Sequence, residues 1–429
     1  MRPDGERTTS TGRGLATGGS MLAAAMLVAN AGNYLLSLFL GRVLTPAEFS
    51  DANLMVTTLF GLTSVALCLQ LVAVRFIARS DELGFPGDSD LLARRLRRVA
   101  LVSGAVAGLA LGLGAPWWSA TFQTASPWPF VILAAGIPFW LVQAVERGVL
   151  QARLRFAPLA LSFVVEMVTR VGIGVLIVSL GGGVPGATVA LSASFVATYA
   201  VVRVANSSRS DRTGDGISLA EVRAYAGLVS VLLIGQIIVN NSDIFVAKAF
   251  LTPTEAGVYA AVALVGRAVF FLAWSVATVV FPVVARRHAA GRESPEVVRT
   301  GIAAVVGIGV VCTAGALWIG GPVLAAVLGP AYGGLSVPMA AYAGTTTLFA
   351  VGNLVASYRL SQSRATESWL LLCASLVQLV LLLVWHRDMA ALIAVQSITM
   401  AVLVTVLGAR ALAGRGTTTP ARAPQEAVS

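Results

Sequence analysis

Leu44-Thr45-Pro46-Ala47-Glu48 recurs as Leu251-Thr252-Pro253-Thr254-Glu255, 207 residues further along a chain of 429. In each copy a threonine stands where a helix N-cap belongs, a proline follows at the first helical position, and a glutamate stands at the third. This order predicts a capping box that opens a helix in both places. The same ungapped offset aligns Asn33 with Asn240. We therefore expect two copies of one helical unit.

The composition sets the class of protein. Hydrophobic residues make up 57% of the chain, charged residues make up 12%, and the mean hydropathy is +0.82. These values predict a polytopic helical membrane protein. The net charge of +10 is also typical of nucleic-acid-binding proteins, but the basic residues lie between apolar runs, where membrane topology accounts for them. We expect no nucleic-acid partner.

Apolar runs long enough to cross about 30 Å of hydrocarbon occur in two sets of six. The first set lies near residues 17–40, 50–76, 99–118, 129–151, 157–180 and 185–203. The second set lies near residues 224–247, 255–284, 300–320, 335–358, 367–385 and 389–409. We expect an all-α membrane protein with about 12 transmembrane helices in two pseudo-symmetric six-helix bundles. The apolar stretch from Pro322 to Leu328 is short, and we expect an outer loop there.

A small, polar segment at residues 206–216 separates the two sets and is typical of a linker. The predicted domains are an N-terminal tail (1–15), an N-lobe (16–204), a linker (205–217), a C-lobe (218–410) and a C-terminal tail (411–429). Ser218-Leu-Ala-Glu221 is a third capping box. It predicts a helix on the membrane surface before span seven.

The basic residues predict the orientation, because lysine and arginine are retained on the cytoplasmic side. The odd-numbered loops hold three of them, Arg42, Lys248 and Arg387, whereas nearly all the others lie in the tails and even-numbered loops. Both termini and the linker are therefore expected in the cytoplasm. A basic helix before span three carries Arg94, Arg95, Arg97 and Arg98. Contact with anionic lipid head groups explains this basic helix, and contact with a substrate pyrophosphate is the alternative.

Ionisable side chains inside predicted spans each cost about 2.5 to 3.5 kcal/mol at a helix centre, and four of them stand out. Glu166 and Arg170 are spaced i, i+4 in span five, so they share a helix face as either a structural clamp or a functional pair. Arg267 lies near the middle of span eight, where a salt bridge to Asp243 or Glu166 is the structural alternative to a substrate contact. Asp243 lies toward the outer end of span seven. A cation at mid-membrane suits a transporter of an anionic head group.

Other polar and small residues give weaker signals. The repeat-related Asn33 and Asn240 either face each other between the halves or bind neighbouring helices. Asp51 and Asn53 lie in the first turns of span two, where we expect solvated or capping roles. A stripe of small residues in span three predicts close helix packing, and it consists of Gly104, Gly108 and Gly112.

No set of residues suits catalysis. Asp88-Ser-Asp90 imitates the metal-binding motif of glycosyltransferases, but its loop is too short to hold a nucleotide-sugar domain. No Walker sequence is present, and the predicted outer loops are too short for an external catalytic domain. Cys68, Cys312 and Cys373 lie within apolar runs and indicate neither a disulfide nor a metal site. We expect no cofactor, and a carrier rather than an enzyme.

Three stretches resemble a known family. Leu38-Phe-Leu-Gly-Arg-Val-Leu-Thr-Pro-Ala-Glu-Phe49 resembles the opening of Wzx-type oligosaccharide flippases, which are polysaccharide biosynthesis proteins of the MOP superfamily. Residues 243–259 resemble the second-half signature of that family, and Leu328-Gly-Pro-Ala-Tyr332 is similar to its turn before span ten. The resemblance covers about residues 16 to 410. It implies two six-helix lobes in a MATE-like V around a central cavity that opens alternately to each side.

The resemblance also implies a function. The expected substrate is a polyprenyl-pyrophosphate-linked oligosaccharide whose head group crosses a bacterial cytoplasmic membrane in the cavity, for export of a cell-surface polysaccharide. Arg170 and Arg267 are expected to bind its anionic groups, supported by Asn33 and Asn240. Glu166 and Asp243 are candidates for binding a coupling proton or Na⁺, or for a structural pair. Besides the substrate, the expected partners are membrane lipids and membrane glycosyltransferases or a polymerase of the same pathway.

Two other functions stay open at this point. A cation-coupled multidrug antiporter of the same superfamily is one, although predicted span one carries no carboxylate to hold a cationic drug. A non-transporting membrane scaffold of a polysaccharide assembly complex is the other. The unpaired cation expected at Arg267 favours a carrier over a scaffold.

Overall fold

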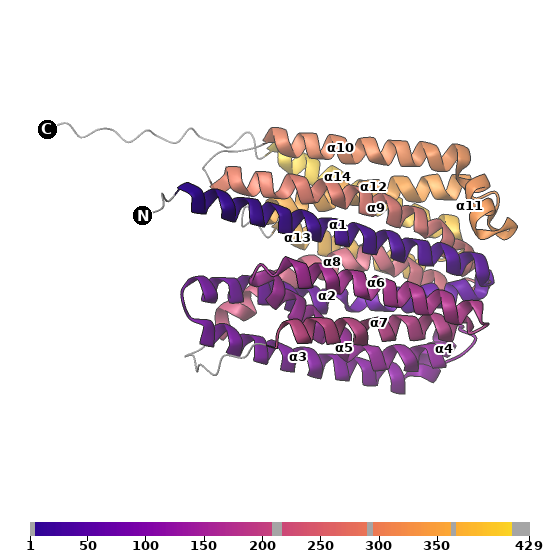
Figure 1. Cartoon of the computed structure of the whole chain (residues 1–429). Coiled ribbons are helices and arrows are strands. Elements are labelled where there is room, and N and C mark those ends of the chain that lie inside the picture. Colours follow the sequence, from indigo (N-terminus) through magenta and orange to yellow (C-terminus); the bar gives the residue numbers. More distant parts are fainter. Residues whose placement is uncertain (1–4, 208–216, 290–294, 362–365, 414–429) are drawn as a thin grey trace.

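The computed structural model describes residues 5–207, 217–289, 295–361 and 366–413, and these residues form helices and their connections (Figure 1). The helices of the N-terminal half are α1 (Gly5–Val43), α2 (Pro46–Glu82), α3 (Pro86–Leu113), α4 (Ala115–Thr121), α5 (Trp128–Ala152), α6 (Phe156–Ser179) and α7 (Gly183–Ala205). Those of the C-terminal half are α8 (Leu219–Phe250), α9 (Pro253–Ala289), α10 (Pro295–Gly315), α11 (Gly321–Leu328), α12 (Ser336–Ser361), α13 (Thr366–Val384) and α14 (Met389–Ala413).

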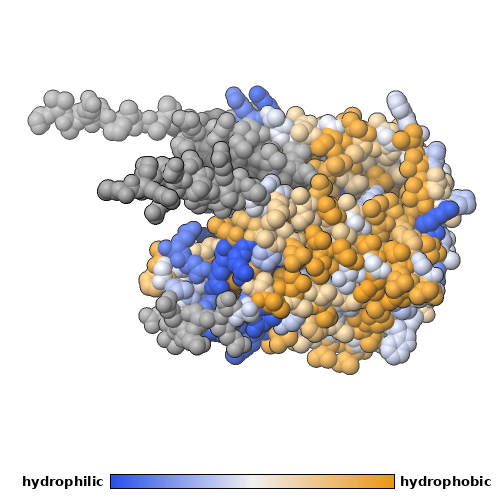
Figure 2. Space-filling model, in the orientation of Figure 1, coloured by the Kyte–Doolittle hydropathy of each residue, from blue (hydrophilic) through white to orange (hydrophobic). Residues whose placement is uncertain are grey.

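The predicted all-α membrane fold is confirmed. Within the described residues, 11 helices are long and apolar enough to cross a membrane, and Trp369–Val384 in α13 is a shorter apolar helix. Together they correspond to the twelve predicted runs. Figure 2 shows an apolar surface over most of the visible helices, with hydrophilic residues gathered at one end of the N-terminal half. The chain is a multi-pass membrane protein.

Both capping boxes of the repeat form as predicted. The Thr45 hydroxyl accepts the Glu48 N–H at 3.3 Å, and the Glu48 carboxylate accepts the Thr45 N–H at 2.9 Å. Thr252 and Glu255 repeat the arrangement at 3.3 and 3.1 Å. Each box satisfies N–H groups that a helix start leaves without partners. The boxes therefore set where α2 and α9 begin.

Three predicted boundaries differ from the structure. The basic helix before span three is continuous with that span as α3, and the apolar run then breaks at Gly114 before the short helix α4. Ser218 does accept the Glu221 N–H, at 3.5 Å, but α8 runs on without a turn, so the predicted surface helix is wrong. The apolar stretch predicted as an outer loop is the short helix α11.

The two ends of the bundle differ in character. Helix α1 begins and helix α14 ends at one end, which we call the basic end, and the two repeated capping boxes lie at the other, which we call the far end (Figure 1). At the far end a single apolar cluster joins the halves, with Leu40 and Phe49 from one and Ala247 and Tyr259 from the other. Residues 1–4, 208–216 and 414–429, which belong to the predicted tails and linker, lie outside the described residues.

The small-residue stripe of α3 packs closely against α5, as predicted. A Cβ at Gly104 would lie 2.7 Å from the Pro138 Cα, and a Cβ at Gly108 would lie 2.7 Å from the Ala134 carbonyl oxygen. No larger residue fits at that separation. This close packing holds α5, which carries one of the site residues below.

Candidate functional site

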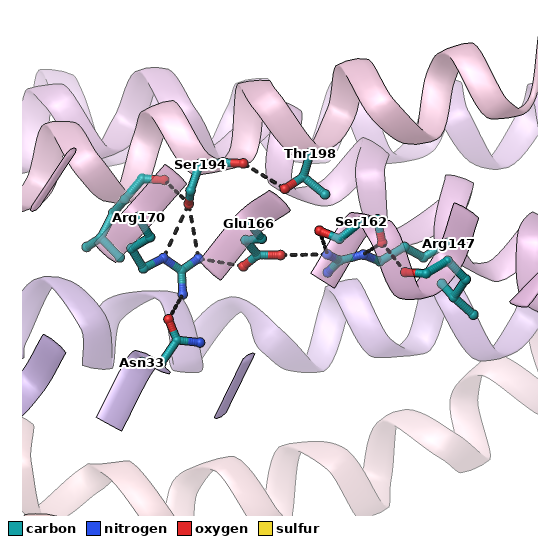
Figure 3. A network of polar contacts seen from close by, with 9 residues as sticks. Asn33, Arg147, Ser162, Glu166, Arg170, Ser194 and Thr198 are labelled. Atoms are coloured by element: carbon teal, nitrogen blue, oxygen red, sulfur yellow. Dashed lines mark hydrogen bonds and ion pairs between the residues drawn. The ribbon is translucent and has the colours of Figure 1, made fainter. Parts of the chain in front are cut away.

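A network of charged side chains lies within the N-terminal half (Figure 3). Glu166 on α6 stands between two arginines: its Oε1 lies 2.5 Å from Arg170 Nη2, and its Oε2 lies 2.7 Å from Arg147 Nη2. The predicted i, i+4 pair is therefore present, and Arg147 on α5 is a third member that the sequence did not suggest. One acid and two bases leave this network with one surplus positive charge.

Hydrogen bonds tie the network to four helices. Arg170 donates to the Asn33 side-chain oxygen on α1 at 3.2 Å and to the Ser194 hydroxyl on α7 at 3.3 and 3.2 Å. Arg147 donates to the Ser162 hydroxyl and carbonyl at 3.0 and 3.1 Å. The side chains of Arg147, Glu166 and Arg170 are between 9% and 14% exposed. A network this buried and this well connected holds α1, α5, α6 and α7 together.

Arg267 on α9 has a different environment. Its Nη2 lies 3.5 Å from the Thr57 hydroxyl, and its guanidinium carbon lies 5.7 Å from the centre of the Phe60 ring, both on α2 of the other half. No carboxylate among the described residues lies within ion-pair distance of it. The salt bridge to Asp243 or Glu166, which was the structural alternative, is not formed. Arg267 thus places between the halves a cation that forms no ion pair with any carboxylate of the described residues.

Asp243 on α8 is fully buried among neutral donors of the C-terminal half. Its Oδ2 accepts the Tyr342 hydroxyl of α12 at 2.6 Å, the Tyr259 hydroxyl of α9 at 2.7 Å and the Gln396 amide of α14 at 3.3 Å. No side chain of the described residues donates to its Oδ1. The buried amide oxygen of Gln378, on α13, also lacks a donor among them, while its nitrogen donates to the Val239 carbonyl on α8.

Of the two alternatives for the repeat-related asparagines, Asn33 follows the helix-to-helix one, because it accepts from Arg170 of α6. Asn240 donates to the Gln236 carbonyl of its own helix at 2.8 Å. The prediction for Asp51 and Asn53 is wrong. Asp51 is neither solvated nor a cap: it is 4% exposed, and its Oδ1 lies 2.6 Å from Lys248 Nζ of the other half. Asn53 is also buried, at 6% exposed. The start of α2 packs against α8, which removes both side chains from water.

With this geometry established, comparison with known proteins places the chain. Residues 39–336 match the family described as polysaccharide biosynthesis protein, which is well over half of the 429 residues. The chain belongs to the polysaccharide biosynthesis protein family. A search of curated proteins finds no match.

Solved structures identify the fold of this polysaccharide biosynthesis protein. An inward-facing multidrug resistance MATE family transporter of the MOP superfamily matches with a TM-score of 0.75 and 14% identity, over 90% of this chain and 96% of that chain. An outward-facing one matches with a TM-score of 0.58 and 17% identity, over 93% and 96%. A MOP superfamily transporter from Pyrococcus furiosus, described as having a binding pocket of reverse polarity, matches with a TM-score of 0.53 and 15% identity, over 94% and 95%. These likenesses show that the chain has a MATE-like fold.

The acidic motif that imitates a glycosyltransferase site has a structural use in this family member. Asp90 pairs with Arg153 Nη2 at 2.7 Å, and Arg153 Nε pairs with Asp81 at 3.1 Å, at the basic end. Burial lowers the pKa of Arg153, but the hydrogen bonds to Asp90 and Asp81 and the charges of these two acids together raise it by more. The net shift of this pKa is therefore upward. No group of three or more His, Cys, Asp or Glu in the described part of the chain could hold a metal ion.

Proposed function

We propose that this protein is a flippase that moves a polyprenyl-pyrophosphate-linked oligosaccharide across the bacterial cytoplasmic membrane by alternating access. The observation that carries the proposal is Arg267, a cation between the halves that contacts a hydroxyl and a ring, and no carboxylate, among the described residues. Such a buried guanidinium, with donors that no described residue accepts, is suited to a phosphate, which it binds through charge-assisted and often bidentate hydrogen bonds. The MATE-like fold supports a substrate path between the halves.

The charge balance of the interior supports an anionic substrate. Both oxygens of Glu166 are occupied by Arg147 and Arg170, so this acid offers no counter-charge to a cationic drug. Arg170 is 14% exposed and carries the surplus charge toward Asn33 of α1. The reversed pocket polarity described for the Pyrococcus furiosus transporter is a precedent within the superfamily for a pocket that differs from those of drug exporters. An antiporter of cationic drugs is therefore the weaker proposal.

We assign the coupling-ion role to Asp243 and the structural role to Glu166. Glu166 is already neutralised by two arginines, whereas Asp243 lies among neutral groups and faces no cation within ion-pair distance in the described residues. An isolated buried carboxylate is costly, and a proton or Na⁺ at its Oδ1 would remove that cost. The proposed coupling ion is a proton or Na⁺ at this carboxylate.

The distribution of basic residues supports the orientation of the proposed flippase. Lys and Arg are retained in the cytoplasm, so we assign the basic end and both termini to that side and the far end to the outside. The exposed Arg94, Arg95 and Arg98 of α3 would then meet anionic lipid head groups at the cytoplasmic surface. Membrane glycosyltransferases or a polymerase of the same pathway would meet the same side or the short outer loops.

Transbilayer movement of a polyprenyl-pyrophosphate-linked oligosaccharide in proteoliposomes tests the proposal. The purified protein should move the lipid faster than empty vesicles do, and Arg267→Ala should abolish most of that movement. Arg410→Ala, which removes an exposed arginine in the last turn of α14, is the matched control and should move lipid at the parent rate. If the lipid does not move while a cationic dye is expelled against a proton or Na⁺ gradient, the antiporter replaces the flippase. If neither the lipid nor the dye is transported, the non-transporting scaffold replaces the flippase as the proposed function.

A further inference from the structure

A buried ion pair joins the two halves at the far end. Lys248 Nζ, on α8, lies 2.6 Å from Asp51 Oδ1 and donates to the Ser50 hydroxyl at 2.7 Å, both on α2. The side chains of Lys248 and Asp51 are 2% and 6% exposed. Lys248 is the one lysine among the 30 basic residues of the chain. The contact between the halves at this end is therefore ionic as well as apolar.

The segments around the pair are in close contact. The Ala125 N–H donates to the second oxygen of Asp51 at 3.0 Å, and the Gln123 amide donates to the Ala249 carbonyl of the other half at 3.0 Å. A Cβ at Gly257 would lie 1.9 Å from the Pro46 carbonyl oxygen, so α9 and α2 touch backbone to backbone. In this conformation the halves are in direct contact around Lys248, whose side chain is 2% exposed.

The repeat does not account for the pair. At the offset that aligns the capping boxes, Lys248 corresponds to Gly41, and Asp51 corresponds to Val258. The repeat-related positions therefore carry neither charge. The ion pair is not part of what the two halves share in sequence.

We propose that the Lys248–Asp51 pair is the latch that holds the far end closed and separates when that end opens. The physical basis is that two buried charges offset each other's loss of hydration when paired, while either one left alone in the closed state is strongly unfavourable. If the halves separate at the far end, both charged side chains become hydrated instead. A pair of this kind makes closed and open states similar in energy, which alternation requires. The latch rests on the proposed alternating access, but it does not depend on which substrate is carried.

The latch is also linked to the Asp243 site by a short stretch of helix. Asp243 and Lys248 are five residues apart on α8, which places them about 140° apart around the helix axis. Asp243 faces Tyr259, Tyr342 and Gln396 within its own half, and Lys248 faces α2 of the other half. The position of Lys248 thus connects the C-terminal half's buried acid to the contact between halves.

Accessibility of the far end tests the latch directly. Ala52, 3% exposed beside Asp51, is replaced by cysteine in a variant that lacks Cys68, Cys312 and Cys373, and a polar maleimide is applied to the protein in lipid nanodiscs, where both ends are reachable. Lys248→Met or Asp51→Asn should raise the labelling rate about tenfold or more, because each leaves one charge buried without its partner. The double variant Asp51→Asn/Lys248→Met should label within about twofold of the parent, since it has no charge to hydrate.

Three outcomes decide the question. Arg79→Met breaks the exposed pair with Glu221 at the basic end, whose side chains are 61% and 57% exposed, and should leave labelling unchanged. Unchanged labelling in folded single variants, judged by size-exclusion profile, would overturn the latch. So would a double variant as open as the single ones, because packing rather than charge would then hold the end closed. Since labelling needs no substrate, a failed lipid assay would count against the flippase and leave the latch standing.

Discussion

Arg147 Nη2 lies 2.7 Å from Glu166 Oε2, the carboxylate oxygen that Arg170 leaves unoccupied. Glu166 is therefore the one acid that compensates two buried arginines, and its loss would leave two like charges facing each other. Breaking a buried pair by removing one partner costs about 3 to 5 kcal/mol. We expect Glu166→Gln to destabilise the protein by that order, seen as a lower midpoint of thermal unfolding in detergent.

The matched control for this substitution is Glu221→Gln. Glu221 also pairs with an arginine, but its side chain is 57% exposed, and exposed pairs contribute about 0 to 1 kcal/mol. The Glu166→Gln and Glu221→Gln proteins should therefore differ clearly in their midpoints of thermal unfolding. Equal midpoints would mean that the Glu166 network does not hold its four helices together.

Substitution of Arg267 by lysine distinguishes the effect of its positive charge from the effect of its hydrogen-bonding geometry. Arg267→Lys keeps the positive charge but loses the planar fork that binds a phosphate through two hydrogen bonds. Each hydrogen bond to a charged group contributes about 1.5 to 3 kcal/mol, so the lysine variant should transport lipid-linked oligosaccharide roughly tenfold more slowly than the parent. Stability should change little, because Arg267 makes one long hydrogen bond and one ring contact in the described residues.

This prediction is checked by initial transport rates in proteoliposomes at equal protein content. The matched control is Arg410→Lys, at an exposed residue of α14, which should transport at the parent rate. Full activity of Arg267→Lys together with inactivity of Arg267→Ala would show that charge alone suffices and that no bidentate contact is made.

The features that the sequence predicted correctly are local ones. The capping boxes at Thr45 and Thr252 depend on residues three apart, and the pairing of Glu166 with Arg170 depends on one helical turn. The spans follow from apolar runs, which the bilayer requires whatever the packing is. Each of these signals lies within a single helix, so it can be recognised before the fold is known.

The features that the sequence missed depend on contacts between distant helices. Arg147 reaches Glu166 from α5, and Tyr342 and Gln396 reach Asp243 from α12 and α14. Asp51 looked like a solvated residue near a helix start, because its partner Lys248 lies in the other half of the chain. The available signals were Lys248, the one lysine of the chain, and Tyr342 within an apolar run. Neither residue type specifies its partner.

Gly257 tests how closely the halves must approach at the far end. A Cβ there would lie 1.9 Å from the Pro46 carbonyl oxygen, and overpacking of this kind costs about 1 to 3 kcal/mol. Gly257→Ala should therefore lower the thermal unfolding midpoint and raise maleimide labelling of a cysteine at position 52. Gly227→Ala is the control, because a Cβ at Gly227 meets nothing within 4 Å and alanine is the better helix former. A Gly257→Ala protein as stable and as closed as the Gly227→Ala protein would contradict the close approach.

Asp243 should respond to neutralisation in the opposite way to Glu166, although both are buried acids. Its Oδ2 is surrounded by the neutral Tyr259, Tyr342 and Gln396, and no arginine or lysine of the described residues pairs with it. Asp243→Asn removes a costly buried charge while its amide oxygen still accepts the tyrosine hydroxyls, so stability should be kept or increased.

The same variant should lose the dependence of transport on an ion gradient. If a proton or Na⁺ binds at Oδ1, parent proteoliposomes move lipid faster when that gradient is imposed, whereas Asp243→Asn proteoliposomes move it at one rate with or without the gradient. Tyr342→Phe, which removes one donor but keeps the acid, should retain a response to the gradient. An Asp243→Asn protein that unfolds like Glu166→Gln, or that responds to the gradient as the parent does, would make this carboxylate a structural group, because a coupling site must be able to lose its charge without losing the fold.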